Sequence, residues 1–256
     1  AILRDLVAEA DVFVQNFRPG VAERLGVAFE DIRALRPDIV YADLTGFGPD
    51  GPYSQRRVYD TVIQGQSGLA ASQTGIRDDQ PKLIKQLICD KVTAYTACQA
   101  ITAALLARER GSGGQHLELS MLDACIAFMF VDAADHEVIL DGDHSGPQAV
   151  AAYNTPFAFR DGFATVAVPD DEEFHGLARA MGVDSSDPDL ATVRDRVAHP
   201  DKTRNFHLQV RENARQLTPP DGHRFYKLIP RLYRQRCLHV VPLHTRDRRN
   251  RDLLGT

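Results

Sequence analysis

The strongest structural pattern in this sequence runs from residue 86 to residue 124, QLICDKVTAYTACQAITAALLARERGSGGQHLELSMLDA. Apolar or small residues recur there at the spacing of one helix face, at Ala94, Cys98, Ile101 and Leu105. The GSGG at positions 111–114 then stops the helix. The segment therefore predicts a long helix with a defined end, followed by residues that alternate in polarity as a strand does.

Asp90 follows Leu87 and Ile88 and immediately precedes the helical run, so it is a candidate N-cap. A carboxylate at that position accepts hydrogen bonds from free backbone N–H groups and is stabilised by the positive end of the helix dipole. Such a group stays ionised and fixed in direction, which suits a nucleophile. Helix capping alone also accounts for an aspartate there, and it is the more common role.

The first 45 residues alternate between helical and strand-like patterns. Residues 2–10 predict a helix, 12–14 a short apolar strand, 21–25 and 29–35 two further helices, and 39–44 a second strand. This order favours a parallel α/β sheet, in which ligands lie beyond the carboxyl ends of the strands. Two loops, QNFRPG at 15–20 and TGFGPDGP at 45–52, are expected at such ends.

Gly46, Gly48 and Gly51 satisfy the spacing G-x-G-x-x-G of dinucleotide-binding loops. We reject that interpretation because Pro49 and Pro52 interrupt the turn and no apolar helix start follows it. A rigid wall of a binding site, with glycines that permit close backbone approach, is the expected role.

Beyond the glycine stop, residues 116–121 predict a strand, and Ser120 and Asp123 are candidate caps of a helix over 122–140. The expected core positions of that helix are Cys125, Phe128 and Val131. His136 is expected to be solvated or packed rather than catalytic. From residue 154 onward, a hairpin turning at Asp161-Gly162 and an amphipathic helix over 171–183 predict a smaller α+β domain.

Composition excludes several classes of protein. Hydrophobic residues make up 43% of the chain and charged residues 25%, and no apolar run of membrane-spanning length is present. Four cysteines without a C-x-x-C pair argue against a zinc site and against a disulfide framework, so we expect no metal, no membrane association and a cytoplasmic location.

Both ends of the sequence are unusual. It begins at Ala1 inside an apparent helix, so we expect preceding residues to be missing. Residues 202–256 contain 13 Lys or Arg against 4 Asp or Glu. Without a helix period or an array of aromatic residues, this basic tail does not predict nucleic-acid binding. We interpret 205–256 as an atypical segment, either frame-shifted or disordered, with a divergent native tail as the alternative.

Three ordered blocks of the chain resemble one family. ADVFVQNFRPGVAERLG, YADLTGFGPDGPYSQRRVYDTVIQGQSGLAASQTG and DKVTAYTACQAITAALLARERGSGGQHLELSMLDA are similar to motifs of the family III CoA-transferases, the CaiB/BaiF family. The resemblance is traceable from about residue 3 to 198. It implies part of a Rossmann-like, CoA-binding large α/β domain over 1–125, a helical linker over 126–147, and the start of a small domain over 148–204, in a protein that forms an interlocked homodimer.

The resemblance also assigns candidate site residues. It implies that Asp90 is the nucleophile and that Tyr59 and Asp60 lie beside it. The residues expected to bind CoA are Asn16, Phe17, Arg18, Arg24 and Arg57, with Phe17 near the adenine. Acyl-CoA and a carboxylic acid are then the substrates, and no tightly bound cofactor is expected. Surface arginines are more often only solvated, but cations at strand ends suit the phosphates of CoA.

The function implied is transfer of CoA from an acyl-CoA donor to a carboxylic acid through a covalent aspartyl intermediate. The racemase branch of the family carries a histidine where this chain has Tyr59, which makes racemisation the less favoured alternative. A non-catalytic, truncated fragment that binds CoA or dimerises is the third interpretation.

Overall fold

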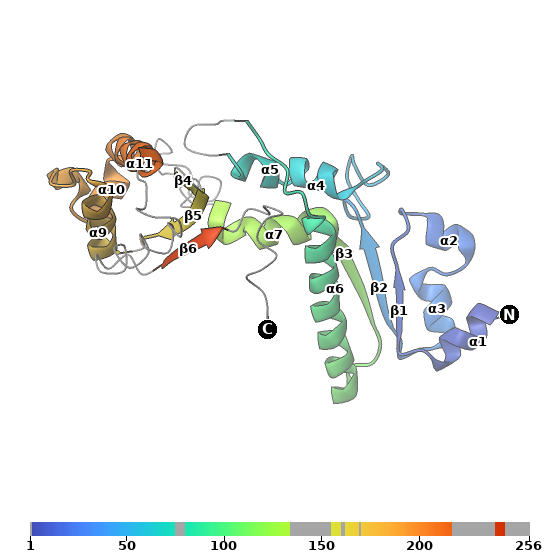
Figure 1. Cartoon of the computed structure of the whole chain (residues 1–256). Helices are drawn as coiled ribbons and strands as arrows, with labels where there is room; N and C mark the ends of the chain where they lie inside the picture. The colour runs from blue at the N-terminus through green and yellow to red at the C-terminus, as the bar shows by residue number, and fades with distance from the viewer. Residues whose placement is uncertain are drawn as a thin grey trace, which may run out of the picture. The chain divides into compact units, whose positions relative to one another are not determined.

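A computed structural model describes residues 2–74, 80–133, 155–159, 162–168, 170–216 and 239–243. These residues belong to two compact units, the first containing the described residues up to 133 and the second those from 155 onward. Each unit has its own strands and its own buried core (Figure 1).

The first unit contains a parallel three-stranded sheet, as the alternation of elements predicted. β1 (Val12–Gln15), β2 (Val40–Thr45) and β3 (Gln115–Ser120) lie in the order β1-β2-β3. Phe13 is in register with Tyr41, and Tyr41 with His116. The central strand is the most buried of the three, and its residues Val40, Tyr41 and Ala42 are buried because helices cover both faces of the sheet.

Three short helices cover one face of this sheet. They are α1 (Ile2–Glu9), α2 (Val21–Leu25) and α3 (Phe29–Leu35), and Figure 1 shows them together in blue beside β1. Val7, Ala22 and Ile32 from these helices pack in one cluster with Tyr41 of β2. The Tyr41 hydroxyl donates to the Val27 carbonyl at 2.9 Å, and burial raises the pKa of Tyr41 to about 12.

The long helix α6 (Ile88–Ala107) contacts β2 and β3. Side chains of a strand alternate between the two faces of a sheet, so Val40 and Ala42 lie on the face opposite to Tyr41, and α6 covers that face. It ends at the predicted glycine stop, where a tight turn, η1 (Arg108–Ser112), contains Gly111 at φ 94°. The predicted face was wrong by about one residue, since Ala94 and Cys98 are exposed. The buried positions are Cys89, Thr93, Ala97 and Ala104.

Three further helices form a second cluster in this unit. Ile63 of α4 (Asp60–Gln66) and Leu69 of α5 (Leu69–Ser72) pack with Cys89 and with Cys125 of α7 (Met121–Ala133). The expectation for Cys125 is confirmed, but Phe128 and Val131 are 58% and 90% exposed. The packed face of α7 runs instead through residues 121, 122, 125 and 129. His136 lies outside the described residues.

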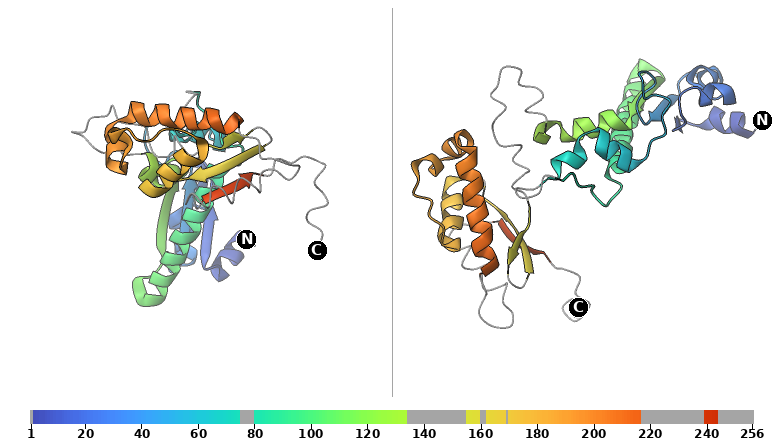
Figure 2. Two further views of the ribbon diagram at one scale, coloured as in Figure 1. Left: turned by 60° about the vertical axis from the view of Figure 1, so that its left-hand side comes forward. Right: turned by 90° about the horizontal axis from the view of Figure 1, so that it is seen from above.

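The predicted hairpin of the second unit is present as β4 (Phe157–Phe159) and β5 (Gly162–Ala167), which pair antiparallel. The predicted amphipathic helix is α9 (Asp171–Met181), and Asp170 caps it by accepting the Glu173 N–H at 2.7 Å. Phe157, Phe174 and Leu177 are buried in this unit's core. Figure 2 shows the helices of this unit gathered beside its strands.

Residues 205–216 do not form a separate tail. They belong to α11 (Pro200–Gln216), whose buried residues Phe206, Val210 and Ala214 recur at helical spacing. Residues 239–243 form β6 (His239–Leu243), antiparallel to β5. The boundary expected at 204 therefore falls inside a packed helix. The rest of the expected tail lies outside the described residues.

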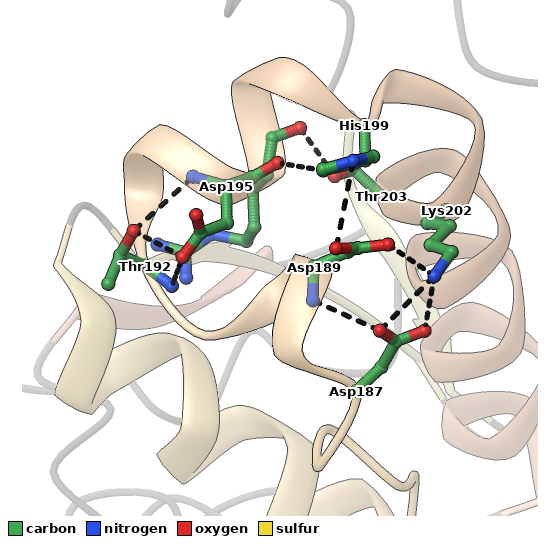
Figure 3. Close-up of polar contacts among 8 residues, drawn as sticks. Asp187, Asp189, Thr192, Asp195, His199, Lys202 and Thr203 are labelled. Atoms are coloured by element: carbon green, nitrogen blue, oxygen red, sulfur yellow. Dashed lines mark hydrogen bonds and ion pairs between the residues drawn. The ribbon is translucent and has the colours of Figure 1, made fainter.

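Charged side chains connect the turns that precede α11 in the second unit (Figure 3). Lys202 on α11 contacts Asp187 at 2.8 Å and Asp189 at 2.5 Å, on either side of the start of the 3-10 turn η3 (Pro188–Leu190). Thr192 and Asp195 cap α10 (Val193–Ala198) reciprocally. The lysine beside Asp187 holds the pKa of that carboxyl below its ordinary value. This network orders the corner of the second unit, and it contains none of the predicted site residues.

Candidate active site

The predicted site residues lie at the carboxyl edge of the parallel sheet. β1 ends at Gln15, β2 at Thr45 and β3 at Ser120, and parallel strands place these three ends together. The Leu122 N–H donates to the Gly46 carbonyl at 3.1 Å, which joins the loop after β2 to the start of α7. The two loops predicted to lie at this edge are therefore both there.

The loop after β1 presents three of the predicted CoA contacts. Asn16, Phe17 and Arg18 are all exposed, and the Phe17 N–H donates to the buried side chain of Gln15 at 2.7 Å. Gly20 ends the loop at φ 82°, a conformation that favours glycine. The buried Gln15 side chain thus holds the backbone of this loop, while the side chains of the loop remain accessible to a ligand.

The loop after β2 lies beside it. The Gln55 side chain donates to the Pro19 carbonyl at 3.4 Å, and this contact brings Arg57 and the loop of residues 46–57 close to the first loop. Arg56 stacks over the Tyr53 ring with 4.0 Å between the guanidinium carbon and the ring centroid. Arg24 and Arg57 are exposed. Arg18 and Arg57 thus come from two adjoining loops and Arg24 from the helix α2 that follows the first loop, and such cations suit an anionic ligand.

The glycine spacing in this second loop does not form a dinucleotide-binding turn. Gly48 and Gly51 have φ values of 86° and 91°, and turns follow them. The next helix, α4, begins only at Asp60. The interpretation as a wall of the site, rather than a phosphate-binding helix start, is consistent with this geometry.

Asp60 is the buried acid of the site, with 3% of its surface exposed. Its Oδ2 accepts the backbone N–H of Cys89 at 2.7 Å and that of Asp90 at 3.1 Å. Its Oδ1 accepts from the Gln64 side chain at 2.5 Å. The carboxylate of Asp60, at the start of α4, therefore caps the start of α6, 28 residues further along the chain.

Asp90 is not the N-cap of its helix, contrary to the prediction. The N-cap is Leu87, which has no capping side chain, and Asp90 is the third residue of α6. The capping role is taken by Asp60, so the Asp90 side chain is left exposed. Among the residues that the structure describes, no hydrogen bond to the Asp90 carboxylate is found. An exposed carboxylate on a fixed helix turn is free to approach a substrate.

Tyr59 is the residue immediately before α4, and its carbonyl accepts the Val62 N–H at 2.9 Å. Its side chain is 69% exposed. The structure therefore places Tyr59, Asp60 and Asp90 at the adjoining starts of two helices. Within the described residues no contact links Asp90 to Arg18, Arg24 or Arg57.

Gln64 and Cys89 were not predicted, and Cys125 was predicted only as a core residue. Gln64 is fully buried behind Asp60, and the spacing of four residues between them on one helix was the available signal. Cys89 and Cys125 form a buried thiol pair beneath the site, and burial raises the pKa of both. These thiols are therefore protonated and behave as packing groups rather than nucleophiles.

A cavity of about 390 Å³ lies on the sheet face that carries α2 and α3, and Pro19, Thr45 and Pro49 from the two loops at the carboxyl edge are among the residues that line it. Carboxylates line it, among them Glu23, Asp43 and Glu118, and burial raises the pKa of Asp43. Acidic walls do not suit the phosphates of CoA. At the start of α6 the geometry offers the exposed carboxylate of Asp90 beside the buried acid Asp60.

The sequence model of CoA-transferase family III matches residues 1–217 of this chain. The chain belongs to this family. A succinate–glutarate CoA-transferase of Agrobacterium fabrum is 33% identical over 208 residues, which cover 78% of this chain and 50% of that protein.

Two further CoA-transferases are similar to this chain at a comparable level of identity. A formyl-CoA:oxalate CoA-transferase of Streptomyces avermitilis is 33% identical over 175 residues, 66% of this chain and 42% of that protein. An acetyl-CoA:oxalate CoA-transferase of Acetobacter aceti is 38% identical over 133 residues, 50% of this chain and 33% of that protein. The chain spans at most about half the length of these curated relatives.

Two solved structures share the fold. A CaiB/BaiF family protein from Brucella suis superposes with a TM-score of 0.70 at 28% identity, over 95% of this chain and 63% of that one. The Mycobacterium tuberculosis protein Rv3272 gives 0.73 at 22% identity, over 95% and 63%. No helix among the described residues combines the length and apolar character needed to cross a bilayer.

Proposed function

We propose that this chain supplies the nucleophile and part of the CoA site of an acyl-CoA:carboxylate CoA-transferase. The observation that carries the proposal is the contact of the Asp60 carboxylate with the backbone N–H groups of Cys89 and Asp90. This contact links Asp60 to the first turn of α6, which carries Asp90, and Tyr59 directly precedes Asp60 in the chain. Family membership supports the reaction class.

The proposed first step is attack of an Asp90 carboxylate oxygen on the thioester carbonyl carbon of the donor. The C–S bond breaks, CoA leaves as the thiolate, and a mixed anhydride forms on Asp90. The thiolate then attacks the aspartyl carbonyl carbon and releases the donor carboxylate, which leaves CoA joined to Asp90 as a thioester. Covalent catalysis of this kind conserves the energy of the thioester bond, so no nucleotide hydrolysis enters the balance.

The acceptor carboxylate reverses these steps. It attacks the aspartyl thioester, expels the CoA thiolate and forms a second anhydride. The thiolate attacks the acceptor's acyl carbon, which yields the new acyl-CoA and restores the Asp90 carboxylate. Tyr59 and Asp60 orient Asp90 or stabilise the charge that develops on the carbonyl oxygens, and backbone N–H groups of the glycine loops act as oxyanion donors.

The acceptors we propose are short mono- and dicarboxylic acids. The names of the relatives above contain succinate, glutarate and oxalate as acids and formyl and acetyl as acyl groups. An acceptor series from formate to glutarate, assayed with each acyl-CoA as donor, identifies which acyl-CoA donor and which carboxylic acid acceptor the chain uses.

Asp90→Asn should abolish CoA exchange, because an amide of the same size is no nucleophile. The measurement is peptide mass spectrometry after incubation with acyl-CoA and hydroxylamine, which converts an activated aspartyl group to a hydroxamate. The hydroxamate is expected on Asp90 in the native chain and absent in the variant. Asp5→Asn, an exposed aspartate of α1, is the matched control and should behave as the native chain does.

Two other outcomes separate the alternatives. Wash-in of solvent deuterium at the α-carbon of the acyl group, without an adduct on Asp90, would indicate racemisation instead. CoA binding by calorimetry without any adduct, in a chain shown to be folded, would indicate a non-catalytic binding fragment. Full CoA exchange by Asp90→Asn would overturn the assignment of the nucleophile.

A further inference from the structure

Gln64 is a completely buried amide that the proposed reaction does not yet use. Its side chain has 0% of its surface exposed. A buried amide is costly unless its donors and acceptor are all satisfied. The contacts that satisfy Gln64 are therefore informative about what holds this part of the unit together.

This amide binds two different parts of the chain, and its nitrogen contacts both of them. Its nitrogen donates to Asp60 Oδ1 at 2.5 Å and to the Ile84 carbonyl at 3.0 Å, while its oxygen accepts the Ile84 N–H at 2.8 Å. The orientation of the amide follows from its partners, because the carboxylate requires a donor and the Ile84 N–H requires an acceptor. Gln64 thus joins Asp60 to the segment that leads into α6.

Asp60, which Gln64 holds, in turn binds the start of α6. Its second oxygen accepts the N–H groups of Cys89 and Asp90, two of the first four amides that a helix leaves without an internal partner. Leu87 supplies no local side-chain cap. The orientation of the first turn of α6 therefore depends on a carboxylate whose other oxygen is held by Gln64.

From this geometry we infer that Gln64 is a positioning residue for Asp90. It holds Asp60 and the segment before α6 in one arrangement, and through them it sets the direction of the nucleophile. The inference rests on the proposed function. Gln64 lies below the surface, so its effect belongs to the chemical steps rather than to the binding of acyl-CoA.

The test is Gln64→Met, which keeps the length of the side chain but removes every hydrogen bond. A misplaced nucleophile lowers the rate of attack, so kcat is expected to fall by about 10- to 100-fold with the KM for acyl-CoA within about twofold. Gln66→Met is the matched control, because Gln66 is exposed on the same helix, and its kcat and KM should be unchanged. An unchanged kcat in Gln64→Met would overturn the inference.

A double-mutant cycle tests the route of the effect. In an Asp60→Asn background, Gln64→Met should reduce kcat much less than it does alone, because both changes break the same chain of contacts. Full additivity would overturn a role that acts through Asp60. If Asp90→Asn retains exchange activity, the proposed function fails instead, and that result is independent of either Gln64 variant.

Amide hydrogen exchange in the native chain provides a test that needs no variant. First-turn amides of a helix ordinarily exchange fast. The N–H groups of Cys89, Asp90 and Ile84 are expected to be protected at least 100-fold over those of an unstructured peptide. Fast exchange at Cys89 and Asp90 would show that Asp60 does not hold this turn, and it would refute the positioning role even if Gln64→Met failed to fold.

Discussion

At the scale of single residues, the environment of Gly114 shows why a glycine is needed at the entry to β3. A Cβ at this position would lie 2.7 Å from the Asp38 carbonyl carbon and in closer contact still with the Ile39 carbonyl oxygen. Both are backbone atoms, which cannot move aside as a flexible side chain can. The close approach of β2 to the turn before β3 therefore depends on the missing side chain.

Gly114→Ala should destabilise the first unit by about 1–3 kcal/mol, because the added methyl group forces the backbone apart. Gly65→Ala is the control. Gly65 lies inside α4 with no atom within 4 Å of an added Cβ, so alanine there should stabilise by roughly 0.5–1 kcal/mol. Urea unfolding curves of the two variants measure both effects. Equal effects of the same sign would contradict the steric argument.

At the scale of elements, the starts of α6 and α7 near the site are capped in different ways. Asp60 caps α6 from another helix, whereas Ser120 caps α7 from within its own sequence. The Asp123 N–H donates to Ser120 Oγ at 2.9 Å, and the Ser120 hydroxyl donates back to the Asp123 carboxylate at 2.5 Å. The second cap was predictable because it is local, and the first was not.

Ser120→Ala is expected to cost about 1 kcal/mol of stability, since Ser120 is buried and its cap has no substitute within α7. Ser112→Ala, at an exposed position in the turn before β3, should be neutral. Thermal unfolding followed by circular dichroism gives the comparison. A neutral Ser120→Ala would mean that other contacts hold the start of α7.

At the scale of the whole molecule, the two units have separate cores, so we expect the stability of each to depend on pH through its own titratable groups. His207 of α11 is mostly buried in the second unit, where burial and the nearby Arg211 and Arg196 lower its pKa from 6.5 to about 4. A histidine of this kind is neutral in the folded chain and binds a proton more readily when unfolded. The stability of the second unit should therefore fall as the pH drops from about 6.5 to about 4.

The full difference between these two pKa values corresponds to about 3 kcal/mol in the free energy of unfolding of the second unit. His207→Gln removes the titrating group and should reduce the loss of stability between pH 7 and pH 4.5. Hydrogen exchange at the two pH values, resolved by peptide, measures the effect in each unit. The change is expected in peptides of the second unit, and an equal change throughout the first unit would contradict it.

The sequence by itself determined most of the elements, some of their ends and the family. Helix and strand periods, the glycines at 111–114, the Ser120 cap and the hairpin at 157–167 are local signals that act within a few residues. The similarity of three ordered blocks indicated the family over much of the chain. These signals do not depend on how the elements pack.

Only the tertiary structure decided which side of each helix is buried and what orients Asp90. Almost every position of α6 and α7 is apolar or small, so periodicity could not choose between neighbouring faces. Asp60 reaches the amide of Asp90 because α4 packs against α6, a contact between residues 30 positions apart. Local periodicity carries no information about such a contact, which arises when buried polar groups must find partners in the folded chain.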